Sequence, residues 1–320
     1  MGEIKSVLVT GATGYLGARI CAHLKECGFQ VFALCRSLPE NIENLFTDIE
    51  ILTGDITKKE TIEYLCSIPL DAVIHTISLD QAQTESYDIT QVNEINVNAT
   101  WFLMDEFAKT NLKTLIYLST IQVIGNLPPN IFDESYNNVP NNKYGLTHLM
   151  GEKLCEFYAN KYKKNYLSLR LSNGYGSPFF KENKWDGLVV NDLVKTAFYE
   201  KKIILKSDGT VIRDFIHIRD ITSAIVDVFK KGNYLNGCYF LASGSTVSLL
   251  QLAHLVKKIY FLRYGAEINV YHSENQLSEQ YVKEEHSTIV NNSKLTTNGF
   301  KIEMTLEDGI NEIFDYLESL

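Results

Sequence analysis

Residues Val7–Gly17 read V-L-V-T-G-A-T-G-Y-L-G, and this stretch decides the fold class. Its first three residues are an unbroken apolar run, which is typical of a strand buried on both faces of a parallel sheet. Three glycines follow at intervals of three, Gly11, Gly14 and Gly17, and apolar residues then recur at helical spacing as far as Leu24. A strand, a glycine turn and a helix in this order predict a dinucleotide-binding site.

Each glycine has a physical role in such a turn. The first permits the tight bend, the second lets the backbone approach a pyrophosphate, and the third lets the helix pack close to the sheet. The helix N-terminus then offers unpaired N–H groups and a partial positive charge to the phosphates. We therefore expect the cofactor to contact the turn and the first helical residues, which are Gly11, Thr13, Gly14, Tyr15, Leu16 and Gly17.

Composition bounds the class of protein. The 320 residues are 45% apolar and 22% charged, as in ordinary globular proteins, and no apolar stretch is long enough for a membrane span. The net charge of −9, without a run of Lys or Arg, disfavours nucleic acid and anionic membranes as partners. The six cysteines are scattered and include no C-x-x-C pair. We expect a cytoplasmic protein with reduced thiols and no metal site.

Apolar strand-like runs alternate with helical patterns over the first half of the chain. This alternation predicts a Rossmann-like α/β fold, a doubly wound parallel sheet with helices on both faces. We assign 1–171 to a dinucleotide-binding Rossmann domain and 172–320 to a smaller mixed α/β substrate-binding part, with part of 211–242 returning to the first. Asp208-Gly209 predicts a hairpin-type turn. The expected strands are 30–36, 49–55, 71–77, 115–120 and 166–171, and the expected helices are 92–110 and 144–162.

Ligands of such sheets bind beyond the carboxyl ends of the strands. Several polar or turn-forming residues fall at these ends and therefore point to a single crevice. They are Gly11, Cys35, Asp55, Thr76, Thr120 and Asn173.

The end of the second strand bears on the choice of cofactor. An acidic residue there would accept hydrogen bonds from the ribose hydroxyls of NAD, but the chain has Cys35 followed by Arg36. An arginine beside the ribose favours the 2′-phosphate of NADP. The alternative is that Arg36 is a solvated loop residue and that NAD binds without the acid. Asp55, after the third strand, is placed to meet the adenine edge.

Two hydroxyl groups fit the chemistry of hydride transfer to or from an alcohol. Such a reaction needs a proton donor or acceptor at the oxygen, and a tyrosine can serve if positive charge lowers its pKa. Tyr144 at a helix start and Thr120 at a strand end satisfy this pattern. His148 lies four residues after Tyr144, so both project from one face of the helix.

Seven motifs spread over most of the chain resemble the extended short-chain dehydrogenase/reductases. The last two, preceded by Asp208-Gly209, are similar to those of the nucleotide-sugar branch, the NAD-dependent epimerase/dehydratase family. The motifs are T-G-A-T-G-Y-L-G from Thr10, D-A-V-I-H from Asp71, N-V-N-A-T from Asn96, S-T-I-Q-V-I-G from Ser119, Y-G-L-T-H-L-M-G-E from Tyr144, R-L-S-N-G-Y-G-S-P from Arg170 and R-D-F-I-H-I-R-D from Arg213.

This resemblance implies roles for particular residues. Thr120 and Tyr144 become the catalytic hydroxyl pair, and Asn173 and Arg213 hold the sugar and the diphosphate of a nucleotide-sugar substrate. The expected contacts of the NAD(P)(H) cofactor extend to Ile56, Thr76, Asn96 and His148. The resemblance also implies a homodimer, in which helices around 93–109 and 144–162 form a four-helix bundle. The alternative is that the apolar sides of these helices face only their own sheet.

The chain departs from the family at His148, where the family has lysine in Tyr-x-x-x-Lys. That lysine bonds the nicotinamide ribose and keeps a positive charge near the tyrosine. Histidine is mostly neutral at pH 7 unless its surroundings protonate it. Three outcomes follow: a protonated His148 replaces the lysine, the reaction needs less acid–base help, or a binding protein without catalysis remains.

A second departure narrows the reaction. Dehydratases of the family carry an acidic pair just after the strand-end threonine, where this chain has Ile121 and Gln122, neither of which can shuttle a proton. We therefore expect hydride transfer at C4, by a 4-keto-sugar reductase or a sugar 4-dehydrogenase. A nucleotide-sugar 4-epimerase is the alternative, and a catalytically silent NAD(P)-binding protein is the alternative of another class.

Overall fold

Seven parallel strands form the central sheet, in the order β11-β7-β5-β4-β1-β2-β3. The computed structural model describes residues 3–39, 42, 46–232, 234, 236–272 and 288–320. The chain winds outward in both directions from β1 and β4, so the switch point of the sheet lies between these two strands. The strands are β1 (Ser6–Thr10), β2 (Gln30–Cys35), β3 (Glu50–Thr53), β4 (Ala72–His75), β5 (Thr114–Thr120), β7 (Asn165–Leu171) and β11 (Gly237–Leu241).

The apolar run that opens the chain lies inside this sheet. All five residues of β1 are buried, and Val9 pairs with Ala33 on one side and Ile74 on the other. The central residues Val7, Leu8 and Val9 have strands on both edges and helices on both faces, and apolar side chains fit there because neither face meets water. The predicted Rossmann-like α/β fold is therefore confirmed.

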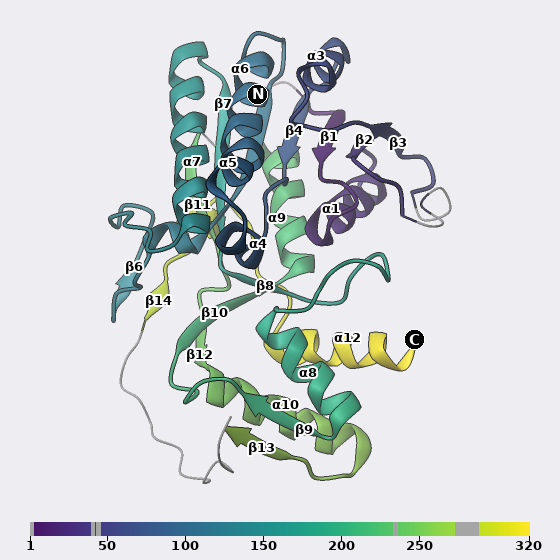
Figure 1. The fold of residues 1–320 in the computed structure, drawn as a ribbon, viewed down its shortest axis with the longest axis vertical. Coiled ribbons are helices and arrows are strands. Elements are labelled where there is room, and N and C mark those ends of the chain that lie inside the picture. The colour runs from purple at the N-terminus through teal and green to yellow at the C-terminus, as the bar shows by residue number, and fades with distance from the viewer. Residues whose placement is uncertain (1–2, 40–41, 43–45, 233, 235, 273–287) are drawn as a thin grey trace.

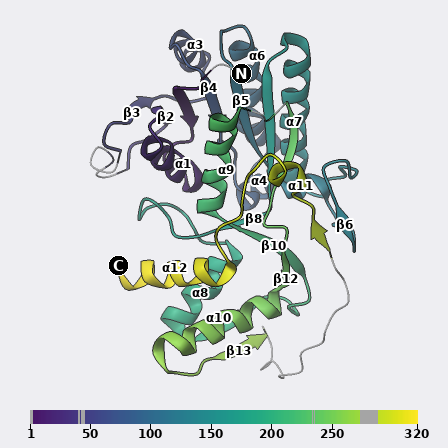
Figure 2. The same ribbon diagram turned by 180° about the vertical axis from the view of Figure 1, so that it is seen from behind.

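Helices cover both faces of the sheet, and Figures 1 and 2 show them from opposite sides. On one face, the apolar sides of α1 and α9 pack against the sheet. On the other face, α3, α6 and α7 form a second core. The bounds are α1 (Tyr15–Glu26), α9 (Ile218–Lys231), α3 (Lys59–Ser67), α6 (Ala99–Ala108) and α7 (Lys143–Tyr162).

The helix expected over 92–110 contains a π-helical segment that the sequence pattern did not indicate. It runs from α5 (Ile89–Val92) through η1 (Asn93–Asn98) into α6. π-helical turns are uncommon and occur frequently at functional sites. Here the segment includes Asn96, one of the residues expected at the cofactor.

A smaller α/β part lies below the carboxyl edge of the sheet (Figure 1). Its core joins three helices to a two-stranded parallel sheet and to β10. The prediction of a hairpin at Asp208-Gly209 is wrong, because β9 pairs in parallel with β13 and not with β10. Gly209 still turns the chain, with a φ of +80°. These elements are α8 (Val189–Glu200), α10 (Leu249–Tyr264), α12 (Leu306–Glu318), β9 (Lys202–Leu205), β13 (Asn269–His272) and β10 (Ile212–His217).

Short elements connect the two parts at the edge of the main sheet. A three-stranded sheet has the order β12-β10-β8, and β6 pairs with β14. No helix in the described part of the chain combines the length and apolar character that crossing a membrane requires. The remaining elements are β8 (Asn173–Tyr175), β12 (Thr246–Ser248), β6 (Ile131–Phe132), β14 (Ile289–Val290), α4 (Gln81–Ser86), α11 (Ser293–Thr296) and the 3₁₀-helix η2 (Ile121–Ile124).

Candidate active site

The glycine turn has the geometry that a dinucleotide cradle requires. Gly11 has a φ of +69°, which a residue with a side chain rarely adopts. A Cβ at Gly17 would lie 2.1 Å from the Gly11 carbonyl oxygen, so α1 packs against the turn only because residue 17 is glycine. A Cβ at Gly14 would lie 3.1 Å from the same oxygen. The turn leaves backbone N–H groups at the N-terminus of α1 accessible to a pyrophosphate, and it fits the cofactor that the sequence implies.

Neighbours of the turn are bonded to the smaller part of the protein. The Tyr15 hydroxyl donates to the Gly176 carbonyl at 2.7 Å, and the Asn183 amide donates to the Thr13 carbonyl at 2.7 Å. Leu16 is only partly buried and packs against the core that α1 and α9 form with the sheet. The segment after β8 therefore lies over the turn, and it forms a long loop below α1 in Figure 1.

The ends of β2 and β3 bring Arg36 near Asp55. The Asp55 carboxylate accepts hydrogen bonds from the Thr57 N–H and hydroxyl, both at 2.9 Å. The bond from the backbone N–H is the main cause of its lowered pKa, and the positive charge of Arg36 contributes. Arg36 is exposed and Ile56 is buried. The guanidinium of Arg36 therefore lies near enough to influence the Asp55 carboxylate at the strand ends where the adenosine is expected.

The side chains of Thr76 and Asn96 both form hydrogen bonds within the protein. The Thr76 hydroxyl donates to the Thr10 carbonyl at 2.6 Å. Asn96 is buried; its side-chain oxygen accepts from the Leu79 N–H at 2.8 Å, and its amide donates to the Thr147 hydroxyl at 3.2 Å. The Asn96 side chain therefore joins the π-helical segment to the loop after β4 and to α7. Its expected contact with the cofactor remains a prediction.

Thr120 ends β5 and begins the 3₁₀-helix η2. Its hydroxyl oxygen accepts from the Gln122 N–H at 3.2 Å. The Gln122 side chain donates to Gln81 and accepts from Asn142, both at 3.0 Å. Gln122 thus fixes the corner where β5, α4 and the start of α7 meet, at the place where dehydratases carry an acid.

Tyr144 and His148 lie in the first turns of α7, with ring centroids 4.2 Å apart. The His148 Nδ1 lies 2.8 Å from the Tyr144 carbonyl oxygen, which can only accept, so Nδ1 carries the proton of the ring. Burial lowers the pKa of His148 to about 4 and raises the pKa of Tyr144 to about 12. Both side chains are therefore uncharged at pH 7.

The surroundings of His148 bear on the first of the three outcomes, in which a protonated histidine replaces the lysine. Tyr117 and His75 continue the same row of rings and bring no negative charge, so this row does not favour a protonated histidine. The centroid distances are 6.1 Å from His148 to Tyr117 and 6.0 Å from Tyr117 to His75. Neutral His148 presents Nε2 as an acceptor, whereas the family's lysine presents a donor.

Two polar side chains near Tyr144, Ser78 and Asp80, and the Lys184 that pairs with Asp80 were not expected from the sequence. The Ser78 hydroxyl bonds to Tyr144, and the negative charge of Asp80 adds to the rise in the tyrosine pKa. Asp80 pairs with Lys184 at 2.8 Å, across 104 positions of sequence. Ser78 and Asp80 lie in the segment between β4 and α4, and the position of this segment after a strand end was the signal available in the sequence. No signal in the sequence pointed to Lys184, because only the tertiary fold brings it to Asp80.

Asn173 and Arg213 lie together at the edge facing the smaller part. An Arg213 Nη1 donates to the Asn173 side-chain oxygen at 3.4 Å. Burial alone lowers the pKa of Arg213. Among the described residues no carboxylate forms an ion pair with it. A half-buried guanidinium without a counter-ion provides a site for an anion.

Residues 7–236 match the NAD dependent epimerase/dehydratase family, and the chain belongs to this family. A putative UDP-glucose 4-epimerase of Methanocaldococcus jannaschii is 23% identical over 314 residues, 98% of each chain. Human dTDP-D-glucose 4,6-dehydratase is 25% identical over 79% of this chain and 73% of its own. The fold is similar to that of Bacillus cereus UDP-glucuronic acid 4-epimerase, solved with UDP-glucuronic acid and NAD, with a TM-score of 0.81, 23% identity, and coverage of 98% of this chain and 99% of that chain.

Proposed function

We propose that the protein transfers a hydride between NAD(P)(H) and C4 of a nucleotide-linked sugar, and that it works as a 4-keto-sugar reductase. The reductive direction is supported by the buried pair Tyr144 and His148, in which the histidine Nδ1 bonds to a backbone carbonyl and burial disfavours a charge on either side chain. When bound, the cofactor supplies or accepts the hydride. The residues of this chain hold the substrate and move the proton.

Tyr144 is in the protonation state from which a reduction starts, and not in the one from which an oxidation starts. With a pKa of about 12, its hydroxyl remains protonated at neutral pH and can donate to the oxygen of a carbonyl under reduction. Oxidation of an alcohol needs the tyrosinate, which at pH 7.5 amounts to roughly one molecule in 10⁴ to 10⁵. Thr120 would donate its hydroxyl proton to the same substrate oxygen, since its own oxygen is already the acceptor for Gln122.

His148 would hold the nicotinamide ribose without supplying charge. Its Nδ1 is committed to the Tyr144 carbonyl, so Nε2 is left to accept a bond from a ribose hydroxyl. Arg213, with Asn173 beside it, would hold the diphosphate, because a guanidinium can donate two parallel bonds to phosphate oxygens. These assignments leave each proposed group in the protonation state that a reduction requires.

Replacing His148 by lysine should change the pH dependence. An ammonium beside Tyr144 favours the tyrosinate, so its pKa falls by about 1 to 3 units. We expect His148→Lys to oxidise the sugar alcohol faster at pH 7–8, with the alkaline rise of the rate profile displaced to lower pH. The control is His148→Gln, which brings no charge and should keep the original profile. Coincident profiles for His148→Lys and the unaltered protein would contradict the account of Tyr144.

C4 epimerisation is the second candidate, and the similarity to 4-epimerases favours it. An epimerase must first oxidise C4 and retain its cofactor through the cycle. A reductase exchanges its cofactor, and Arg36, directly after β2 where the ribose would bind, supports NADPH as that cofactor. We keep NADP(H) as a prediction; the similar Bacillus cereus epimerase was solved with NAD.

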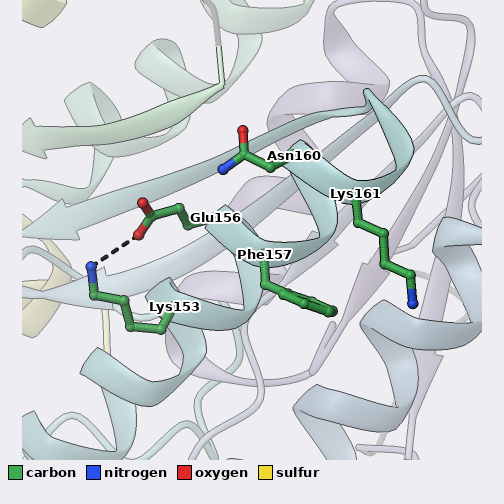
Figure 3. A pocket seen from close by; sticks show the side chains of 5 residues that line it. All are labelled: Lys153, Glu156, Phe157, Asn160 and Lys161. Atoms are coloured by element: carbon green, nitrogen blue, oxygen red, sulfur yellow. Dashed lines mark hydrogen bonds and ion pairs between the residues drawn. The ribbon is translucent and has the colours of Figure 1, made fainter.

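A homodimer through α6 and α7 also belongs to the proposal. Large apolar side chains stand exposed on these helices, with Trp101 at 52%, Leu146 at 50% and Phe157 at 52% exposure. Figure 3 shows an open pocket on the outer side of α7, where Phe157 lies among charged side chains. Apolar helix faces of this kind support the four-helix arrangement, and with reduced cysteines we expect such a dimer in the cytoplasm.

Cofactor oxidation tests the proposal directly. The protein is incubated with NADPH or NADH and a 4-keto sugar linked to UDP or dTDP, and absorbance is followed at 340 nm. A reductase consumes the reduced cofactor in step with the ketone. An epimerase interconverts C4 epimers of the parent sugar without net consumption. Cofactor binding with no turnover of any nucleotide sugar would favour the silent binding protein and overturn the proposal.

A further inference from the structure

A buried carboxylate lies directly after Arg213 on β10. Asp214 is 2% exposed, and successive residues of a strand project to opposite faces. Asp214 therefore faces away from its neighbour and into the protein. None of the expected cofactor contacts or catalytic roles involves it.

Hydrogen-bond donors from two other segments converge on this carboxylate. Its Oδ1 accepts from the Ser172 hydroxyl at 2.6 Å and from the Ser243 N–H at 2.9 Å. Its Oδ2 accepts from the Ser243 hydroxyl at 2.9 Å and from the Gly244 N–H at 2.8 Å. Each oxygen thus accepts one backbone N–H. The carboxylate joins β10 to the end of β7 and to the turn after β11.

The backbone of Asp214 also orients the expected substrate residues. Its carbonyl oxygen accepts from the Asn173 amide at 2.8 Å, and the oxygen of that amide accepts from Arg213 at 3.4 Å. The Asn173 amide therefore has one orientation, fixed at both ends. A shift of β10 relative to β7 would move the Asp214 carbonyl and the Arg213 guanidinium away from the Asn173 amide, which lies on β8 directly after β7.

We propose that Asp214 is a positioning residue for the substrate subsite: its carboxylate locks β10 against β7 and the turn at Ser243, and so holds Arg213 and Asn173 where the diphosphate of a nucleotide sugar binds. This inference rests on the proposed function. It predicts that loss of the carboxylate weakens diphosphate binding selectively. The dinucleotide is expected at the glycine turn, which Asp214 does not touch, so its binding should be unaffected.

Asp214→Asn tests this selectivity. Whichever way the amide is turned, its NH₂ faces the Ser243 or the Gly244 N–H, and a donor opposed to a donor costs a hydrogen bond and its desolvation. We expect the Kd for UDP or dTDP, measured by calorimetry, to rise about 10-fold or more, while the Kd for the dinucleotide stays within about 2-fold.

The control is Asp71→Asn at the opposite end of the sheet. Asp71 also accepts two backbone N–H groups, from Lys5 at 2.8 Å and Ser6 at 3.1 Å. This variant should lose stability without any change in the Kd for UDP. Ser172→Ala removes one donor to Asp214 and leaves both backbone donors, so it should weaken UDP binding in the same direction by less. If Asp214→Asn does not fold, the Kd of Ser172→Ala for UDP tests the positioning role in its place.

The outcomes separate this inference from the proposed function. If the unaltered protein binds neither UDP nor dTDP, the proposed function fails and this inference fails with it. If the unaltered protein binds one of them and both Asp214→Asn and Ser172→Ala bind it equally well, only the positioning role is overturned. An equal loss of affinity for the diphosphate and the dinucleotide would also overturn it, because it would indicate general destabilisation.

Discussion

Tyr144→Phe is expected to lower kcat by about 10²- to 10⁴-fold, because it removes the proton donor at the substrate oxygen. The ring, its contact with His148 and the helix start are all kept, so folding and cofactor affinity should change little. The rate is measured with the reduced cofactor and a 4-keto nucleotide sugar at saturating concentrations. KM should stay within a few-fold, since the hydroxyl acts mainly in the transition state.

Tyr162→Phe is the matched control for this change. Tyr162 ends the same helix, far along α7 from Tyr144, and stacks on Tyr158 with ring centroids 6.1 Å apart. It should retain the activity of the unaltered protein. If Tyr144→Phe were as active as Tyr162→Phe, another group would have to move the proton, and the hydroxyl of Ser78 beside Tyr144 would be the next candidate.

Arg213→Ala is expected to raise KM for the nucleotide sugar by about 10²-fold. Charge-assisted bonds to a phosphate group in a half-buried site are worth about 2 to 5 kcal/mol when one partner is truncated. The loss should fall on binding, so kcat at saturation should change less than KM. Steady-state kinetics over a wide substrate range separates these effects.

Arg219→Ala controls for the loss of a positive charge. Arg219 lies on α9, shortly after β10, and is exposed, with its guanidinium near the sulfur of Met304. It should leave KM unchanged. A KM for Arg213→Ala equal to that of Arg219→Ala would show that the unpaired guanidinium does not hold the substrate.

Local patterns predicted the elements that depend on local chemistry. The apolar run and three glycines of Val7–Gly17 impose a buried strand, a tight turn and a close-packed helix, and the structure has all three. Thr120 ends β5 opposite Leu171 at the end of β7, and Asn173 follows two residues later at the start of β8. These features depend on periodicity and backbone freedom, which neighbouring residues determine.

Features that depend on tertiary contacts could not be predicted in the same way. The hairpin expected at Asp208-Gly209 does not form, because β9 pairs in parallel with β13, which lies more than 60 residues later in the sequence. The charge state of His148 depends on burial among other rings, and the sequence alone left it open. The ion pair of Asp80 with Lys184 joins two loops and has no local signature.

The central claim is that an uncharged Tyr144 works as a proton donor in reduction at C4. Its most direct test follows the hydride itself. NADPH or NADH that carries deuterium at C4 of the nicotinamide ring is incubated with a 4-keto sugar linked to UDP or dTDP, and the sugar product is analysed by mass spectrometry and NMR. The account predicts a C4 alcohol that carries one deuterium, formed as the reduced cofactor is consumed. A sugar recovered as the unlabelled ketone, with the reduced cofactor intact under conditions in which both bind, would contradict it.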